Sequence, residues 1–255
     1  MMNFSWALIA LLSCCLLLIA LPSCAGERSL HTPEILGENS HSGRDQFEIE
    51  RQEMVEYQIR DRGIQDQRVL AAMSKVPRHE FVESPWKDFA YSDRPLPIGH
   101  QQTISQPYIV AYMSETAEIS PDDKVLEIGT GCGYQAAILG EIAKEVYSIE
   151  IIPELAARAR QTLSQLGYEN IEVKTGDGYQ GWVEHAPYDA IIVTAAPEKI
   201  PQALIEQLAT NGKMVIPVGG GWHQDIIVLT KTEDRIIKEK TIPVRFVPMR
   251  RKLLK

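Results

Sequence analysis

The chain has 255 residues, of which 44% are hydrophobic, and a formal net charge of −8. Residues 1–26 contain no Lys, Arg, Asp or Glu, so the whole acidic charge lies on the rest of the chain. This acidic balance argues against nucleic-acid binding through a general basic face. The part after residue 26 has the length of one α/β domain.

The first 26 residues are predicted to be an apolar leader, because only Ser5 and Ser13 are polar between residues 4 and 21. This length suits a signal peptide or a marginal membrane anchor. A cleavage site or a lipid-modified cysteine fits the small residues around Cys24, but no positive charge precedes the apolar core. Residues 27–46 are expected to be a flexible tether and residues 47–255 the folded domain.

Periodicity and turn signals predict the elements of the domain. Helices are expected at 47–62, 66–74 and 107–117. Residues 85–99, rich in proline and aromatic side chains, are predicted to be an ordered loop. The rest is predicted to alternate, with strands at 124–128, 145–150, 171–175, 188–193, 212–217, 225–231 and 238–244 and helices at 134–143, 153–166 and 199–209.

This alternation predicts an α/β fold: a single Rossmann-like domain with a mostly parallel, doubly wound sheet and helices on both faces. A ligand of such a fold lies at the carboxyl ends of the strands, near the point where the strand order reverses. Four predicted strand ends carry Gly129, Glu150, Asp177 and Thr194. We therefore expect these four segments to converge on one crevice.

The most informative stretch is VLEIGTGCGYQ, residues 125–135, in which a strand runs into Gly129, Gly131 and Gly133. Glycine permits positive φ and lets the backbone approach a ligand, and the next helix offers free N–H groups. A dinucleotide fingerprint would place its third glycine at Tyr134, which disfavours a nicotinamide oxidoreductase. The observed spacing resembles the first motif of S-adenosylmethionine (AdoMet) methyltransferases.

Three acidic residues are candidates for the cofactor site. Glu127 belongs to the glycine motif itself. Glu150 ends the next strand, 21 residues after Gly129, where its carboxylate can accept hydrogen bonds from ribose hydroxyls. Asp177, followed by Gly178, could accept from the adenine amino group or could simply fix a turn.

Cysteine and histidine usage predicts neither a disulfide nor a metal site in the domain. Three of the four cysteines lie in the leader, which leaves Cys132 alone. Cys132 is interpreted as a small filler in the glycine loop rather than a reactive thiol. The six histidines are scattered, and no Cys/His cluster has metal-ligand spacing.

A second segment, PLPIGHQQTISQPYIV at residues 95–110, narrows the function. Together with the glycine loop, GDG at 176–178 and VRFVPM at 244–249, it closely resembles the protein-L-isoaspartate O-methyltransferase family, from about residue 47 to 249. QTISQPYIVA is the most specific part, because AdoMet enzymes in general share only the glycine loop. One mild departure is Cys132, where the family usually has serine.

The resemblance implies an enzyme that transfers the AdoMet methyl group to the free α-carboxylate of L-isoaspartyl residues in damaged proteins. It implies that Ser105 is the active-site serine and orients this carboxylate, while Thr103 and Ile104 shape the pocket. No G-x-S-x-G surrounds Ser105, so a Ser-His-Asp mechanism is not expected. Spacing alone would instead make Ser105 a helix N-cap.

The resemblance also implies that main-chain groups near Val244, Phe246 and Val247 pair with an extended substrate peptide. Such pairing carries no side-chain code and would tolerate many sequences. An ordinary last strand is the structural alternative for this segment. The basic residues that follow it could attract acidic damaged segments, but they are interpreted as a solvated tail.

Two other functions remain open from the sequence: an AdoMet enzyme acting on a small molecule, and a non-catalytic AdoMet-binding module. The expected partners are isoaspartyl-containing proteins and peptides, with no nucleic acid and with possible membrane contact through residues 1–26. A monomer is expected. The cytoplasm is the expected compartment because AdoMet is made there, and a periplasmic or membrane-anchored protein is the alternative.

Overall fold

The computed structural model describes residues 43–221 and 223–251. The predicted leader, and the predicted tether up to residue 42, lie outside the described residues. Within the described ranges, no helix is both long enough and apolar enough to cross a membrane. The elements are α1 Gly43–Glu53, α2 Gln67–Lys75, β1 Leu96–Pro97, β2 Thr103–Ile104, α3 Pro107–Thr116, β3 Lys124–Ile128, α4 Tyr134–Ile142, β4 Glu145–Glu150, α5 Pro153–Gln165, β5 Ile171–Thr175, β6 Tyr188–Val193, α6 Gln202–Gln207, β7 Leu208–Gly220, β8 His223–Lys231 and β9 Ile236–Val244.

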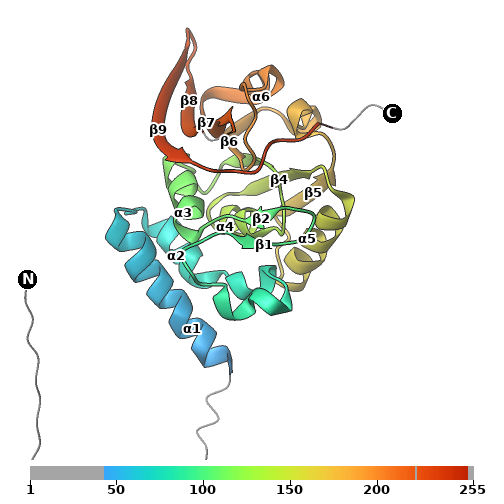
Figure 1. Ribbon diagram of the computed structural model, residues 1–255. Coiled ribbons are helices and arrows are strands. Elements are labelled where there is room, and N and C mark those ends of the chain that lie inside the picture. Colours follow the sequence, from blue (N-terminus) through green and yellow to red (C-terminus); the bar gives the residue numbers. More distant parts are fainter. Residues whose placement is uncertain (1–42, 222, 252–255) are drawn as a thin grey trace, which may run out of the picture. The chain divides into compact units, whose positions relative to one another are not determined.

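Seven strands form one sheet in the order β5-β4-β3-β6-β7-β8-β9 (Figure 1). Strands β3 to β7 pair in parallel, and β8 and β9 add an antiparallel edge. The chain leaves β3 toward β4 on one side and later returns to β6 on the other, so the strand order reverses between β3 and β6. The predicted mostly parallel, doubly wound sheet is confirmed.

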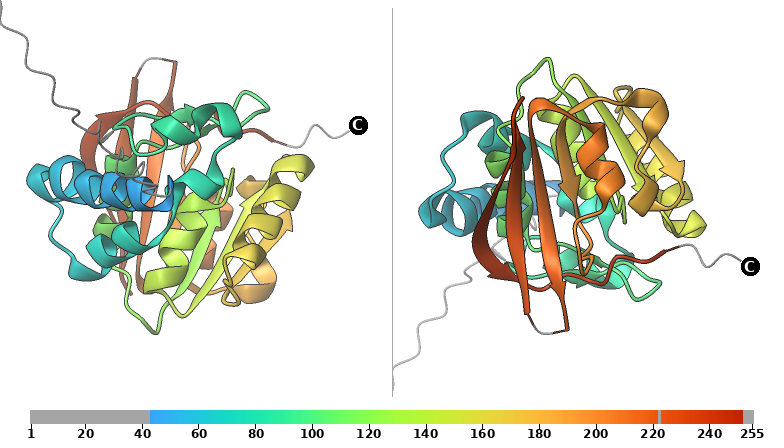
Figure 2. Two further views of the ribbon diagram at one scale, coloured as in Figure 1. Left: turned by 90° about the horizontal axis from the view of Figure 1, so that it is seen from below. Right: turned by 90° about the horizontal axis from the view of Figure 1, so that it is seen from above.

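Both faces of the parallel strands are buried, as such a sheet requires. In β3, Val125 packs into one hydrophobic cluster and Leu126 into another, and in β6 Ile192 and Ile191 divide in the same way. The first cluster includes side chains of α2 to α5, and the second includes side chains of α6. Figure 2 shows these helices on the two sides of the sheet.

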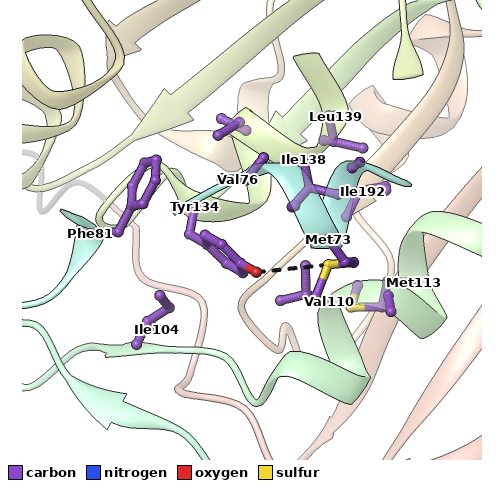
Figure 3. Close-up of a cluster of buried hydrophobic side chains, with 14 of the residues drawn as sticks. Met73, Val76, Phe81, Ile104, Val110, Met113, Tyr134, Ile138, Leu139 and Ile192 are labelled. Carbon is purple, nitrogen blue, oxygen red and sulfur yellow. Dashed lines mark hydrogen bonds between the residues drawn. The ribbon is translucent and has the colours of Figure 1, made fainter. Parts of the chain in front are cut away.

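The N-terminal helices cover one end of the first cluster. The predicted helix at 47–62 is observed as α1 followed by a π-helical segment, Met54–Ile59, and a 3-10 turn. It starts four residues earlier than predicted, at Gly43. Helix α2 is capped by Asp66, whose carboxylate accepts the Arg68 N–H at 2.8 Å. Residues from α2, α3 and α4 meet around Tyr134 in the core (Figure 3).

Several predicted boundaries differ from the structure, among them β7, which spans Leu208–Gly220 rather than 212–217. Helix α6 is shorter than the predicted 199–209, because Pro201 precedes its first turn and Leu208 already pairs with β6 as the start of β7. The predicted loop at 85–99 contains a 3-10 helix, Ser84–Phe89, and part of the small β1–β2 pairing. Strand β9 ends at Val244, as predicted, and residues 245–251 then leave the sheet edge and cross toward the other side of the domain (Figure 1), so the alternative of an ordinary last strand for residues 244–249 does not hold. We call these residues the C-terminal strap.

Candidate active site

The expected crevice lies where the strand order reverses. The ends of β3 and β6 are joined there by Thr194, whose N–H donates to the Ile128 carbonyl at 2.9 Å and whose hydroxyl donates to the Gly129 carbonyl at 2.6 Å. A cleft of about 800 Å³, including the part open to solvent, extends from this junction. Its walls are the glycine loop, the end of β4, the segment around Ser105 and the C-terminal strap.

The glycine loop adopts the backbone conformation that its sequence predicts. Gly129, Gly131 and Gly133 have φ values of 99°, 55° and 96°. Gly129 and Gly131 line the cleft, and a Cβ on Gly129 would meet the Thr194 hydroxyl at 2.5 Å. Gly133 does not line the cleft. It precedes the first turn of α4, and a Cβ there would make ordinary contact with Leu163 of α5 at 3.4 Å, so its positive φ rather than crowding favours glycine.

Glu150 brings a carboxylate to the cleft at the end of β4. Its side chain is almost fully buried, and one oxygen accepts the Gly131 N–H at 2.8 Å while the other accepts the Ile152 N–H at 2.9 Å. These bonds hold the carboxylate against the glycine loop. Because a carboxylate oxygen has two lone pairs, each oxygen can still accept a hydroxyl from a ligand in the cleft.

Glu127 lies behind the loop and does not line the cleft. It is fully buried, accepts a short hydrogen bond from the Ser148 hydroxyl, and leaves its Oε1 without a partner. Burial raises the pKa of Glu127, the Ser148 hydrogen bond lowers it and the neighbouring Glu150 raises it, and the net result is a pKa of about 8. The carboxyl group is therefore mostly protonated near neutral pH.

Asp177 and Gly178 form the turn after β5. The Asp177 carboxylate accepts the Tyr179 N–H at 2.9 Å and so fixes the turn, and its side chain is not part of the cleft wall. The geometry thus supports the turn-fixing interpretation of Asp177 rather than a cofactor contact. Gly178 does line the cleft, and a Cβ there would collide with Ile128.

The segment around Ser105 forms the opposite wall. Ser105 and Thr103 line both the cleft and a second cavity beside it, whereas Ile104 lines the cleft only. The residue that caps α3 is Gln106, and no side chain caps that helix. The N-cap interpretation of Ser105 is therefore wrong, and its hydroxyl is not used by the helix.

The C-terminal strap forms a further wall of the cleft. The Val247 carbonyl accepts the Ala196 N–H at 2.9 Å, and the Met249 N–H donates to the Ala196 carbonyl at 2.9 Å. Both main-chain groups of Phe246 are taken by the Gln224 side chain, at 2.6 and 3.2 Å. Tyr179 adds two contacts: its hydroxyl donates to the Met249 carbonyl at 3.4 Å, and Arg251 lies over its ring. The strap is thus held by separate contacts of this kind rather than by a strand ladder.

These bonds limit which strap groups can pair with a peptide. The main chain of Phe246 is already satisfied inside the protein. Val244 and Phe246 line the second cavity, and Val247 lines both cavities. Sequence reasoning missed Gln224 and Arg78, because no local pattern distinguishes them from surface residues. It also did not single out the cleft-lining Gln102, although this residue begins the QTISQPYIVA motif.

Cys132 lines the cleft but is buried, and burial raises the pKa of its thiol to about 11. A protonated, buried thiol is unreactive, which agrees with a filler role. In the described part of the chain, no group of His, Cys, Asp and Glu residues is arranged to hold a metal ion.

The side chains of the cleft select the chemistry of a ligand. Arg250 is the one cation among the described residues that line it, and Glu150 is the one carboxylate. A pyrophosphate would require several donors or cations, whereas the hydroxyl groups of a nucleoside suit the Glu150 carboxylate. The sheet, loop and cleft define a Rossmann-like fold with a nucleoside-type cofactor site, and the residues present fit AdoMet.

Comparison with known proteins specifies the family. The sequence model of the protein-L-isoaspartate(D-aspartate) O-methyltransferase family matches residues 49–253. The protein-L-isoaspartate O-methyltransferase of Gloeobacter violaceus is 63% identical over 199 residues, which are 78% of this chain and 97% of that protein. The enzyme of the same name from a Picosynechococcus strain is 60% identical over 199 residues, covering 78% of this chain and 89% of the relative.

Solved structures agree. A protein-L-isoaspartate O-methyltransferase superposes with a TM-score of 0.71 at 27% identity, over 77% of this chain and 65% of that one. A Plasmodium falciparum protein-L-isoaspartate O-methyltransferase, solved in complex with S-adenosyl-L-homocysteine, gives a TM-score of 0.69 at 25% identity, over 79% of this chain and 99% of that one. The chain belongs to the protein-L-isoaspartate(D-aspartate) O-methyltransferase family.

Proposed function

We propose that this protein methylates the free α-carboxylate of L-isoaspartyl residues in damaged proteins and peptides, with AdoMet as the methyl donor. The observation that carries the proposal is the position of Ser105, which lies on the wall shared by the cofactor cleft and the second cavity. A methyl donor in the first cavity and a carboxylate in the second would meet at this residue. Family membership supplies the donor and the acceptor.

The acceptor needs little chemical activation. A carboxylate is ionised at neutral pH, so the site requires no strong general base. When bound, AdoMet supplies a methyl group on a sulfonium, which the carboxylate oxygen attacks in line while the sulfur keeps the bonding electron pair. The products are a methyl ester and S-adenosylhomocysteine. Because opposite charges disappear in this step, alignment in a water-poor cleft provides most of the acceleration.

The chain's own residues then act as follows in the proposal. The Ser105 hydroxyl donates a hydrogen bond to the substrate carboxylate and keeps it in line, and Thr103 and Ile104 shape the space around it. Glu150 accepts the ribose hydroxyls while it holds the Gly131 N–H. Val247 and the neighbouring strap groups align the peptide in the second cavity, where main-chain contact tolerates many sequences.

The test is methyl transfer from labelled AdoMet to a matched pair of peptides that differ only in an L-isoaspartyl or an L-aspartyl residue. We expect a base-labile methyl ester on the isoaspartyl peptide alone. Equal labelling of both peptides, or labelling of small carboxylic acids but of neither peptide, would contradict the proposed substrate. Tight AdoMet binding without transfer to any acceptor would instead indicate a binding module.

We propose a cytoplasmic location for the domain and a monomeric state, on the basis of AdoMet supply and of the acidic, non-repetitive sequence. Cell fractionation with mass analysis of the mature N-terminus tests the location. An intact Met1 in a cytosolic or inner-membrane fraction agrees with it. A chain that begins at Gly26, or at a lipid-modified Cys24, would show export instead.

A further inference from the structure

Arg78 is a charged side chain in the interior of the domain. It is fully buried, at 0% exposure, and is one of the largest fully buried side chains among the described residues. No carboxylate of the described residues lies within ion-pair distance of it, and its Nη1 has no hydrogen-bond partner. A buried, unpaired charge costs free energy, and an apolar side chain of similar volume would fill the same space more cheaply. The role of the guanidinium must therefore lie in the groups that it contacts.

The guanidinium joins three segments that are distant in sequence. Its Nε donates to the Ala90 carbonyl at 2.7 Å, and its Nη2 donates to the Ser105 carbonyl at 2.6 Å. Its Cζ lies 4.7 Å from the ring centroid of Tyr134, the first residue of α4 and the direct neighbour of the glycine loop. Figure 3 shows Tyr134 in the core between Phe81 and Ile104, the residue that precedes Ser105.

Ser105 depends on this contact. It lies between the end of β2 and the start of α3, and the bond from Arg78 is the one hydrogen bond that the described residues give it. Ser105 lines the cleft, and its hydroxyl does not cap the helix that follows. The position of this hydroxyl relative to the glycine loop is consequently set by a guanidinium that contacts both sides.

We propose that Arg78 is a positioning residue for methyl transfer: it fixes the main chain at Ser105 against the glycine loop, so that the serine hydroxyl presents the substrate carboxylate in line with the methyl donor. This inference rests on the proposed function. A shift of about 1 Å in a group that aligns the substrate carboxylate lowers the rate of methyl transfer. It need not weaken the binding of AdoMet.

The test compares Arg78→Met with Arg51→Met. Methionine keeps packing on the Tyr134 ring but cannot donate hydrogen bonds. Arg51 is the control, because it is also buried and its Nε donates to a carbonyl, that of Ser74, at 2.6 Å, but its hydrogen-bond and ion-pair partners among the described residues include neither Ser105 nor Tyr134. Three quantities are measured for each: kcat on the isoaspartyl peptide, AdoMet affinity by calorimetry, and amide hydrogen exchange of residues 102–106 and 129–135.

For Arg78→Met we expect kcat to fall about 10- to 100-fold, as loss of alignment does. AdoMet affinity should stay within about threefold of the wild type, since the glycine loop keeps its shape. Exchange should accelerate in residues 102–106 and not in 129–135. Arg51→Met should lower the melting temperature. At temperatures where this variant is folded, kcat and the exchange rates of both segments should equal those of the wild type.

A folded Arg78→Met enzyme with wild-type kcat would overturn the proposal. So would a parallel loss of kcat and AdoMet affinity in both variants, which would indicate a structural role only. If Arg78→Met does not fold, Arg78→Lys takes its place: an ammonium cannot span both carbonyls, so kcat should still fall while AdoMet binds. Wild-type kcat in Arg78→Lys would reject the two-carbonyl clamp. If the wild type itself fails to methylate the peptide, the proposed function is wrong, and the exchange data alone decide on Arg78.

Discussion

Ser105 is the residue whose replacement separates chemistry from cofactor binding. Ser105→Ala removes one hydroxyl donor and leaves the main chain, and hence the bond from Arg78, in place. Loss of one positioning donor costs about 2–4 kcal/mol of transition-state stabilisation, so kcat should fall by one to three orders of magnitude while AdoMet affinity stays the same. Steady-state kinetics and calorimetry measure the two effects. Ser164→Ala, on the exposed side of α5, should change neither.

Glu127 makes the stability of the protein depend on pH. Its pKa is about 8 in the folded protein, against an ordinary value of 4.5. Folded protein therefore holds a proton that unfolded protein releases between these values, and the free energy of unfolding falls as pH rises through this window. Glu127→Gln keeps the shape and removes the titration. The free energy of unfolding of the variant minus that of the wild type should therefore rise by on the order of 3 kcal/mol from pH 5 to pH 8. Urea denaturation at both pH values measures this, and a difference that does not change with pH would contradict it.

Among individual residues of the site, those that belong to sequence motifs could be predicted, and those that only the fold brings together could not. Glu150 and the two cleft-lining glycines of the loop, Gly129 and Gly131, were predictable, because the strand and loop that carry them are contiguous. Arg78 was not predictable, because its role depends on hydrogen bonds to the carbonyls of residues 90 and 105, which only the fold brings together. Asp177 was open between two roles, since a turn and a ligand use the same carboxylate.

The glycine loop is an element whose geometry can be tested as a unit. Gly131 has φ of 55°, its N–H is held by Glu150, and a Cβ there would lie 3.2 Å from Ile98. A β-branched side chain at this φ is strained and would fill the cleft wall. Gly131→Val should therefore abolish AdoMet binding, as measured by calorimetry on folded protein.

Gly167→Val is the matched control for the loop. Gly167 also has positive φ, 82°, but a Cβ there has nothing within 4 Å. This variant should lose stability from backbone strain and still bind AdoMet. If both variants bind AdoMet with near-normal affinity, the loop does not contact the cofactor in the way proposed.

Elements were predictable where local pattern and fold agree. The strands of the parallel sheet are apolar runs bounded by turns, and β3, β4, β5 and β6 occur at the predicted residues. The β1–β2 pairing is only two residues long on each side and leaves no periodic signal. The C-terminal strap resembles a strand in composition, but its path is fixed by Gln224 and Ala196, which lie far from it in sequence.

For the whole molecule, length and alternation predicted one α/β domain, and the question that remains is how much of the chain it needs. Helix α1 belongs to the domain: Phe47 stacks on His79 with ring centroids 4.2 Å apart, and Arg51 donates to α2 at Ser74. The family match begins at residue 49, inside this helix. By contrast, residues 1–42 consist of the uncharged apolar leader and a polar stretch without a periodic apolar face.

We therefore expect a chain that starts at Gly43 to fold and to methylate isoaspartyl peptides with the kcat/KM and melting temperature of the full chain. A chain that starts at Met54 lacks α1, so it loses the Phe47–His79 stack and the Arg51 bonds, and its melting temperature should drop. Thermal denaturation and the peptide assay on the three lengths measure this. Reduced kcat/KM in the chain starting at Gly43 would mean that the first 42 residues contribute to catalysis. An unchanged melting temperature in the chain starting at Met54 would mean that α1 is dispensable, because its packing on α2 and His79 would then add no net stability.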